Sequence, residues 1–187
     1  MRPDIHRLRA FGLIALLSCL AAAQAKGPAV GSPAPDFTAY SFLDGSKTRL
    51  SDQHGKIVIL TFWATWCAPC RQELPNLESI QEHVGNDRLV VLAVSYRDTD
   101  ETQRYLRRKA KEAGWNIAML ADPNSSIAAR YGVSAIPHMV VIDRTGTIVA
   151  VHEGFGEGAV DELLPQLNAL LSNKPLAPIP AAGPQMQ

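Results

Sequence analysis

The 187-residue sequence predicts a single α/β domain. Apolar runs alternate along the chain with amphipathic stretches, and the runs at 57–63 and 88–95 are almost continuously apolar, which is typical of strands buried inside a sheet. No repeat of fixed period and no long block of like charge interrupts this alternation. The chain is long enough for one sizeable hydrophobic core, but not for two comfortable ones.

The expected elements follow one another at short intervals. In chain order they are a hairpin over 37–50, a strand over 57–63, a helix over 71–84, a strand over 88–95, a helix over 100–113, a strand over 117–120, a helix over 122–131, a hairpin of strands 139–143 and 147–151, and a helix over 158–171. Turn-forming residues separate the strands of the two hairpins, Asp44-Gly45 in the first and Arg144-Thr145-Gly146 in the second. Gly114 and Gly132 end two of the helices.

Two of the helices are amphipathic, and each contains a proline. Their apolar faces consist of Leu74, Leu77 and Ile80 in helix 71–84 and of Val160, Leu163, Leu164 and Leu167 in helix 158–171. Pro75 is expected to kink the first helix, and Pro165 to lie near the start of the second or to bend it. Both helices therefore present one side to the core.

The first 25 residues predict an export signal. Arginines precede an apolar run over 10–23 that is too short to span a bilayer comfortably. Ala23-Gln24-Ala25 has the small residues of an ordinary cleavage site, whereas the segment ending Leu17-Ser18-Cys19 resembles a lipobox in which Cys19 would be lipidated. Simple cleavage, lipid attachment and an uncleaved signal-anchor all remain open, and each implies a periplasmic or other extracytoplasmic location.

Composition marks the limits of the domain and the class of its partners. Residues 26–35 are rich in Gly, Pro and Ala and predict a linker, 36–172 form the folded domain, and 173–187 form a Pro/Ala-rich tail. Lys plus Arg and Asp plus Glu each number 18, so no net field draws the protein to nucleic acid or to an anionic membrane surface. No motif in the sequence calls for a cofactor.

Cys67 and Cys70 are the two cysteines of the folded domain. A dithiol that exchanges disulfides needs one thiolate to attack and a second thiol close enough to resolve the mixed disulfide. Cys67 falls just after a predicted strand, at the N-terminus of the next helix, where free backbone N–H groups and the helix dipole favour its anionic form. We therefore expect Cys67 to be the nucleophile and Cys70 the resolving thiol. The alternatives are half of a zinc site or two buried small residues, but no second Cys-x-x-Cys and no His-x3-His completes a ligand set.

Residues 62–75, with the sequence FWATWCAPCRQELP, resemble the active-site segment of TlpA/ResA-type thioredoxin-like proteins. Residues 31–37 resemble the opening segment of that family, and residues 131–137 resemble its substrate loop. The resemblance covers roughly 30–171. It implies a thioredoxin fold, with a central mixed β-sheet flanked by helices and an N-terminal β-hairpin extension.

The resemblance also indicates where a substrate binds. It implies a cis peptide bond before Pro137, which would face the cysteines and leave the backbone of Ile136 free to pair with an extended substrate segment. Trp66, next to the nucleophile, is positioned to form part of a flat docking surface, and Pro69 belongs to the same expected contact. Without the resemblance, Pro137 would be only a loop proline before a strand.

Glu73 is a candidate proton acceptor. It lies three residues past Cys70, about one helical turn along and on nearly the same face. It would accept or relay the proton of Cys70, and when ionised it would raise the pKa values of the thiols by like-charge repulsion. The alternative is an exposed helix glutamate. Thioredoxin has a buried aspartate where this chain has Thr61, so the resemblance implies that Glu73 substitutes for that acid.

His138 departs from the family pattern, in which the residue after the cis proline is often threonine. Its imidazole could lie near both sulfurs, where it would tune the thiolate or help to bind a metal. The alternative is a histidine at a strand edge with a solvated ring. Trp63, by contrast, is expected in the core.

The sequence therefore predicts an exported protein-disulfide reductase or oxidoreductase. The resemblance implies that its substrates are disulfide-bearing exported proteins, as in cytochrome c biogenesis or copper-site assembly, and that a membrane thiol-disulfide carrier supplies its electrons. Two other functions stay open, a Cu(I)-binding delivery module that uses Cys67, Cys70 and His138 and a thiol peroxidase. The motif also leaves open whether the protein reduces or oxidises its substrates.

Overall fold

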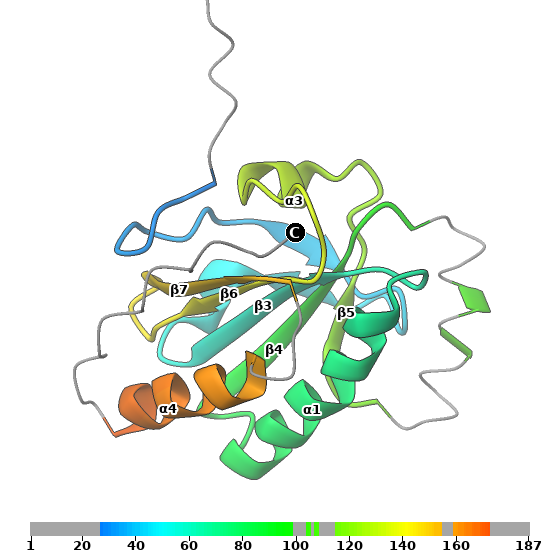
Figure 1. Cartoon of the computed structure of the whole chain (residues 1–187). Coiled ribbons are helices and arrows are strands. Elements are labelled where there is room, and N and C mark those ends of the chain that lie inside the picture. The colour runs from blue at the N-terminus through cyan, green and yellow to red at the C-terminus, as the bar shows by residue number, and fades with distance from the viewer. Residues whose placement is uncertain (1–26, 99–103, 106, 109–114, 155–158, 173–187) are drawn as a thin grey trace, which may run out of the picture.

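A five-stranded mixed sheet forms the centre of the computed structural model, which describes residues 27–98, 104–105, 107–108, 115–154 and 159–172 (Figure 1). The strands of this sheet are β3 (Ile57–Trp63), β4 (Leu89–Ser95), β5 (Ala118–Leu120), β6 (His138–Ile142) and β7 (Ile148–Glu153), and a separate hairpin consists of β1 (Thr38–Tyr40) and β2 (Lys47–Arg49). The strand order is β5-β4-β3-β6-β7. β4 pairs in parallel with β3 and with β5, whereas β6 runs antiparallel to β3 and β7.

Helices cover both faces of the sheet (Figure 1). They are α1 (Ala68–Val84), α3 (Ser126–Arg130) and α4 (Ala159–Leu171), with a 3₁₀ turn, η1 (Leu50–Gln53), after the hairpin. α1 and α4 lie on one face, and α3 and the hairpin lie on the other. Every residue of β3 is buried, because its side chains alternate between these two layers. This arrangement confirms the predicted α/β architecture with an N-terminal hairpin.

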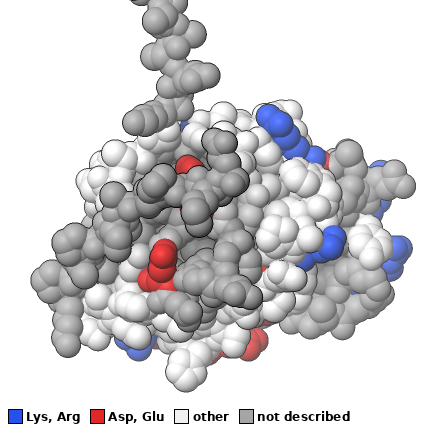
Figure 2. All heavy atoms as spheres, in the orientation of Figure 1, with Lys and Arg blue, Asp and Glu red and all other residues white. Residues whose placement is uncertain are grey.

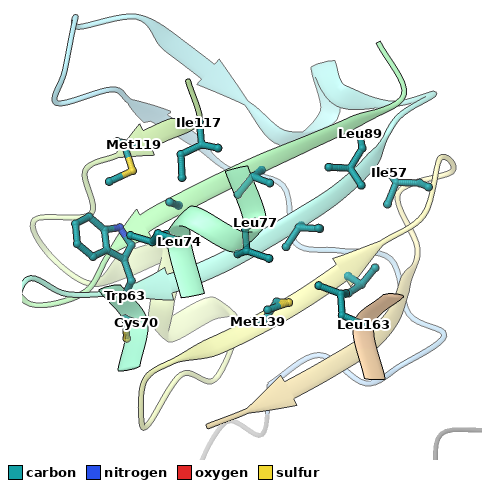
Figure 3. Close-up of a cluster of buried hydrophobic side chains, with 14 of the residues drawn as sticks. Ile57, Trp63, Cys70, Leu74, Leu77, Leu89, Ile117, Met119, Met139 and Leu163 are labelled. Atoms are coloured by element: carbon teal, nitrogen blue, oxygen red, sulfur yellow. The ribbon is translucent and has the colours of Figure 1, made fainter. Parts of the chain in front are cut away.

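The hydrophobic cluster on the α1 face reaches the cysteines (Figure 3). Leu74 and Leu77 of α1 pack there with Ile57 and Trp63 of β3. Cys70 belongs to the same cluster and lies at the same end of it as Trp63. The core packing of α1 on the sheet therefore also fixes the position of the cysteine pair.

Backbone from the N-terminal part of the chain pairs with part of each edge of the sheet. At the β5 edge, hairpin residues 40–42 and residues 119–121 exchange two backbone hydrogen bonds of 3.0 Å. At the β7 edge, residues 31–34 form backbone hydrogen bonds with residues 146–148, although composition predicted a linker for 26–35. These contacts reduce the amount of unpaired edge backbone that another chain could bind. Residues 31–34 are therefore packed as part of the domain.

Two helices begin at positions that differ from the prediction. α1 begins at Ala68, three residues early, because Cys67 caps it and Pro69 lies in its first turn. α3 begins four residues later than expected, because the buried carboxylate of Asp122 accepts hydrogen bonds from the backbone N–H groups of 126–128. In both cases a side chain ahead of the helix satisfies N–H groups that have no partner within the helix.

Some of the predicted elements lie outside the described residues. These are the export signal over 1–25, the tail over 173–187 and most of the helix over 100–113, of which the four described residues are helical.

Pro75 and Pro165 lie inside α1 and α4, and neither proline ends its helix. Within the described ranges, no helix combines the length and the apolar character that crossing a bilayer would need.

Charged side chains of both signs are scattered over the face shown in Figure 2, with uncharged residues between them. This distribution agrees with the equal numbers of basic and acidic residues in the sequence. Large apolar side chains that are exposed among the described residues are Val30, Tyr40, Trp66, Tyr105 and Leu164. Trp66 has the largest exposed fraction of these, 60%.

We expect Leu77→Ala to lower the free energy of unfolding by about 2–5 kcal/mol, because Leu77 is fully buried where α1 packs on the sheet. Leu164→Ala is the matched control, since Leu164 is a helical leucine that is 41% exposed. The control should change the unfolding free energy by no more than about 0.5 kcal/mol. Urea denaturation measures both values, and equal losses in the two variants would show that α1 packing does not dominate stability.

Candidate active site

The two cysteines lie where β3 passes into α1. Cys67 is the N-cap residue of α1, with an extended backbone (φ −86°, ψ 99°), and Pro69 follows in the first turn, where its missing N–H has no cost. A disulfide joins Cys67 to Cys70, with 2.07 Å between the sulfur atoms and 5.3 Å between the Cα atoms. The structure is therefore that of the oxidised protein.

The two sulfur atoms have different surroundings. Cys67 Sγ accepts a hydrogen bond of 3.3 Å from the backbone N–H of Cys70, and it lies at the positive end of the α1 dipole. Cys67 is 5% exposed and Cys70 is 1% exposed. In a reduced protein the same N–H group and dipole would stabilise a thiolate on Cys67. Cys70 lies deeper, where it can reach Cys67 but not a large substrate.

Glu73 is a buried acid and not an exposed helix residue. It is 2% exposed, and its Oε1 accepts a hydrogen bond of 3.3 Å from the hydroxyl of Thr61 on β3. Burial raises the pKa of the Glu73 carboxyl to about 7, and the hydrogen bond from Thr61 opposes this shift only in part. The carboxyl therefore changes its charge near neutral pH, where it can take up and release a proton.

The loop before β6 reaches the same end of the sheet as the cysteines. β6 runs antiparallel to β3, and Phe62 pairs with His138, so Pro137 lies beside the end of β3 from which Cys67 follows. The peptide bond between Ile136 and Pro137 is cis, as predicted. Ile136 is partly buried and packs against the cluster that contains both cysteines.

The two tryptophans of this segment have opposite surroundings. Trp63 is fully buried in the core, as predicted, and its Nε1 has no hydrogen-bond partner within the described part of the chain. Trp66 is 60% exposed and directly precedes Cys67. Pro69 is exposed on the other side of Cys67 in the sequence. Exposed apolar residues therefore lie on both sides of Cys67 in the sequence.

His138 is buried, so the expectation of a solvated ring at a strand edge is wrong. It is 3% exposed and packs edge-on against Phe62, with 5.9 Å between the ring centroids. Phe62 belongs to the cluster on the α3 face, whereas Cys67 and Cys70 belong to the cluster on the α1 face. Burial lowers the pKa of His138, although the Glu153 carboxylate, 3.7 Å from its Nδ1, opposes the shift.

The position of His138 bears on the copper hypothesis. Its ring lies on the opposite side of the sheet from both sulfurs, so it cannot complete a Cu(I) site with Cys67 and Cys70 in this conformation. Among the residues that the structure describes, no group of three or more His, Cys, Asp and Glu side chains is arranged to hold a metal ion.

Asp98 is a further carboxylate at this end of the sheet, and no sequence motif indicated it. It lies three residues after β4, and its two oxygens accept hydrogen bonds from the backbone N–H of Thr65, at 3.3 and 3.2 Å, and from the Thr65 hydroxyl, at 2.8 Å. Burial raises the pKa of Asp98, and the hydrogen bonds from Thr65 oppose this in part. The one feature that could have indicated Asp98 is the parallel pairing of β3 and β4, because parallel neighbouring strands end at the same edge of the sheet.

The chain matches the model of the AhpC/TSA family over residues 30–151. It is similar to thioredoxin-like protein YneN of Bacillus subtilis (strain 168), with 38% identity over 124 residues, which is 66% of this chain and 71% of that protein. It is also similar to thiol-disulfide oxidoreductase ResA of Geobacillus thermodenitrificans (strain NG80-2), with 33% identity over 126 residues, which is 67% of this chain and 70% of that protein.

Solved structures share the fold. A putative thiol:disulfide interchange protein DsbE from Chlorobium tepidum has 30% identity and a TM-score of 0.68, over 76% of this chain and 98% of that chain. The pneumococcal exposed lipoprotein thioredoxin from Streptococcus pneumoniae strain TIGR4 has 34% identity and a TM-score of 0.58, over 70% of this chain and 98% of that chain. The predicted thioredoxin fold is thereby confirmed.

We expect Glu73 to make the stability of the oxidised protein depend on pH. Its pKa is about 7 in the folded protein against an ordinary value of 4.5, so the folded state holds this proton more tightly than the unfolded chain does. The stabilisation from the protonated carboxyl is fully present below pH 4.5 and is lost as the pH rises through 7. The loss is on the order of 3 kcal/mol.

Urea denaturation at several pH values between 4.5 and 8 measures this effect. Glu73→Gln should remove the loss, because glutamine carries no charge at any pH. Glu82→Gln, at an exposed position of the same helix, should keep the pH dependence of the wild-type protein. A Glu73→Gln variant whose stability followed the wild-type curve would assign the pH dependence to other groups.

Proposed function

The chain belongs to the AhpC/TSA family and is a thioredoxin-like thiol-disulfide oxidoreductase, and on this premise we propose that it reduces disulfides in partner proteins outside the cytoplasm. The observation that carries the proposal is the position of Cys67. It caps α1, its sulfur accepts the backbone N–H of Cys70, and it is the more exposed of the two cysteines. A thiolate held in this way is suited to attack a substrate disulfide.

The reaction then takes two exchange steps. The Cys67 thiolate attacks one sulfur of the substrate disulfide and forms a mixed disulfide, while the other substrate sulfur leaves as a thiolate and takes up a proton. Cys70 loses its proton and attacks Cys67 Sγ, which breaks the mixed disulfide; the second substrate sulfur leaves as a thiolate and takes up a proton, so the substrate is released as a dithiol. Cys67 and Cys70 remain joined by the disulfide that the structure contains. A membrane thiol-disulfide carrier is the proposed donor of the two electrons that restore the dithiol.

Glu73 is the proposed acceptor of the Cys70 proton. It follows Cys70 by one turn of α1, and the Thr61 hydroxyl holds its carboxyl in one orientation. With a pKa of about 7, a substantial fraction of Glu73 is ionised at neutral pH and can take up a proton. An ionised Glu73 also disfavours a second negative charge on Cys70, so the resolving thiol stays protonated until it is needed.

Substrate binding is proposed to involve the two surface segments beside the disulfide. Trp66 and Pro69 offer exposed apolar contacts around Cys67. Within the described residues, the backbone of Ile136 makes no hydrogen bond to other backbone groups. An extended substrate segment could therefore pair with it next to Pro137, as a strand does at an open edge.

The proposed location and substrates follow from the N-terminal segment and from the relatives. The predicted export signal over 1–25 supports a place outside the cytoplasm, with Cys19 as the residue that a lipid would anchor. One solved relative is named an exposed lipoprotein thioredoxin, and another a putative interchange protein DsbE. The proposed substrates are disulfide-bearing exported proteins such as apocytochrome c or proteins that assemble copper sites.

We expect the Cys67–Cys70 pair to have a reduction potential near about −270 mV, the value of reducing thioredoxins. The measurement is an equilibrium titration in dithiothreitol buffers on protein that begins at Lys26. A value near about −120 mV would instead indicate an oxidant, and the proposed direction of the reaction would be wrong.

We expect Cys67→Ser to abolish the reduction of insulin disulfides, because no nucleophile remains, and Cys70→Ser to accumulate a mixed disulfide, because nothing resolves it. Insulin turbidity measures the first effect, and a non-reducing gel measures the second. Activity of Cys67→Ser close to that of the wild-type protein would contradict the assignment. Consumption of hydrogen peroxide by the reduced protein at a rate comparable to insulin reduction would favour the thiol peroxidase.

A further inference from the structure

The Asp98 carboxylate accepts hydrogen bonds from Thr65, in the active-site loop between β3 and α1. Its two carboxylate oxygens accept three hydrogen bonds, and all three come from Thr65, two from the backbone N–H and one from the hydroxyl. Thr65 and Asp98 are 33 residues apart in the sequence, so this contact joins the loop after β3 to the loop after β4. Asp98 is half-buried, and a half-buried carboxylate is kept there only if its hydrogen bonds offset part of the desolvation.

The backbone conformation after β4 places the Asp98 side chain next to Thr65. The backbone N–H of Tyr96 donates to the carbonyl of Trp63 at 2.7 Å, which extends the pairing of β3 and β4 by one residue. Arg97 then has a left-handed backbone (φ 54°), which is unfavourable for a residue with a side chain, and its guanidinium lies over the Tyr96 ring at 4.8 Å. The strand ends in a tight change of direction, and the next residue is Asp98.

Other contacts fix the remaining backbone groups around Trp66. The carbonyl of Thr65 accepts a hydrogen bond of 2.7 Å from Arg71 Nη1, and the N–H of Cys67 donates to the carbonyl of Ala64 at 3.1 Å. The backbone is therefore held on both sides of Trp66, while its indole is 60% exposed. A fixed backbone that presents an exposed aromatic side chain is the arrangement expected of a preorganised docking element.

We propose that Asp98 is a positioning residue, which holds Thr65 so that the exposed indole of Trp66 is preset for docking of a partner protein beside Cys67. The inference rests on the proposed exchange of disulfides with partner proteins, and it names the residue that fixes the docking surface. It concerns binding of a large substrate and not the chemistry of the sulfurs. A small disulfide that reaches Cys67 without contacting Trp66 should therefore be insensitive to Asp98.

The test compares a protein disulfide with a small disulfide. For insulin, Asp98→Ala should raise KM by about tenfold with little change in kcat, since a misplaced contact weakens productive binding. For bis(2-hydroxyethyl) disulfide, the same variant should keep kcat/KM within about twofold of the wild-type value. Trp66→Ala should give the same pattern. In the Trp66→Ala background, Asp98→Ala should have no further effect on KM, because two residues that act through one contact are not additive.

Two further variants distinguish positioning of Thr65 by Asp98 from an effect of the Asp98 charge and from a general loss of stability. Asp98→Asn keeps an oxygen that accepts from Thr65 and should recover most of the insulin KM. Asp143→Ala is the matched control, because Asp143 also accepts hydrogen bonds from a threonine hydroxyl and from backbone N–H groups, in the turn between β6 and β7. It should have wild-type kinetics with both substrates, although it loses a comparable set of hydrogen bonds.

Several outcomes would overturn the inference. These are an unchanged insulin KM in Asp98→Ala, an equal loss with the small disulfide, additivity with Trp66→Ala, or an Asp98→Asn variant as impaired as Asp98→Ala. Failure of the proposed function has a different signature, because the wild-type protein itself would then fail to reduce insulin. If it oxidised reduced ribonuclease instead, the same ratios of KM values would be measured on ribonuclease and on a small dithiol.

Discussion

The junction between β3 and α1 is the constraint on which the rest of the structure depends. β3 is buried along its whole length, with a strand on each side and helices on both faces, so its end has a fixed position in the molecule. A thiolate is stabilised by a helix N-terminus only if that helix is held in place. Leu74 and Leu77 provide this hold by packing α1 onto the sheet. The apolar contacts that stabilise the fold therefore also set the position of the reactive sulfur.

Glu73 and Asp98 both carry a carboxyl group, but their different surroundings suit the two groups to different roles. Glu73 is almost fully buried and accepts one hydrogen bond, from Thr61, so desolvation dominates and the carboxyl titrates near neutral pH. Asp98 is half-buried and accepts three hydrogen bonds from one residue, so the contacts define a geometry. A carboxyl with few partners is suited to proton transfer, whereas one with many partners is suited to holding a backbone in position.

Features that depend on neighbouring residues could be predicted from the sequence. The run of apolar residues over 57–63 predicted β3 at its observed bounds, and Asp44-Gly45 predicted the first hairpin. The side of the sheet that His138 faces could not be predicted, because it depends on the register of β6 against β3. No sequence motif indicated the contact between Asp98 and Thr65 either, since it requires two loops far apart in the sequence to meet at one edge of the sheet. Local sequence patterns predict helices and strands, but the register of strand pairing and the contacts between distant loops require the folded structure.

The topology also explains how recognition can vary independently of reactivity. β3 and β4 are parallel and β6 is antiparallel to β3, so the loops after β3 and β4 and the loop before β6 meet at one end of the sheet. In the proposed docking, a partner protein contacts the exposed Trp66 and side chains from the loops after β4 and before β6, and these last two loops contribute nothing to the cap of α1. The thiolate, in turn, depends on the helix N-terminus and on a buried acid that no partner touches. Substitutions in the loops after β4 and before β6 can therefore change which disulfides are bound while the exchange chemistry of Cys67 and Cys70 stays the same.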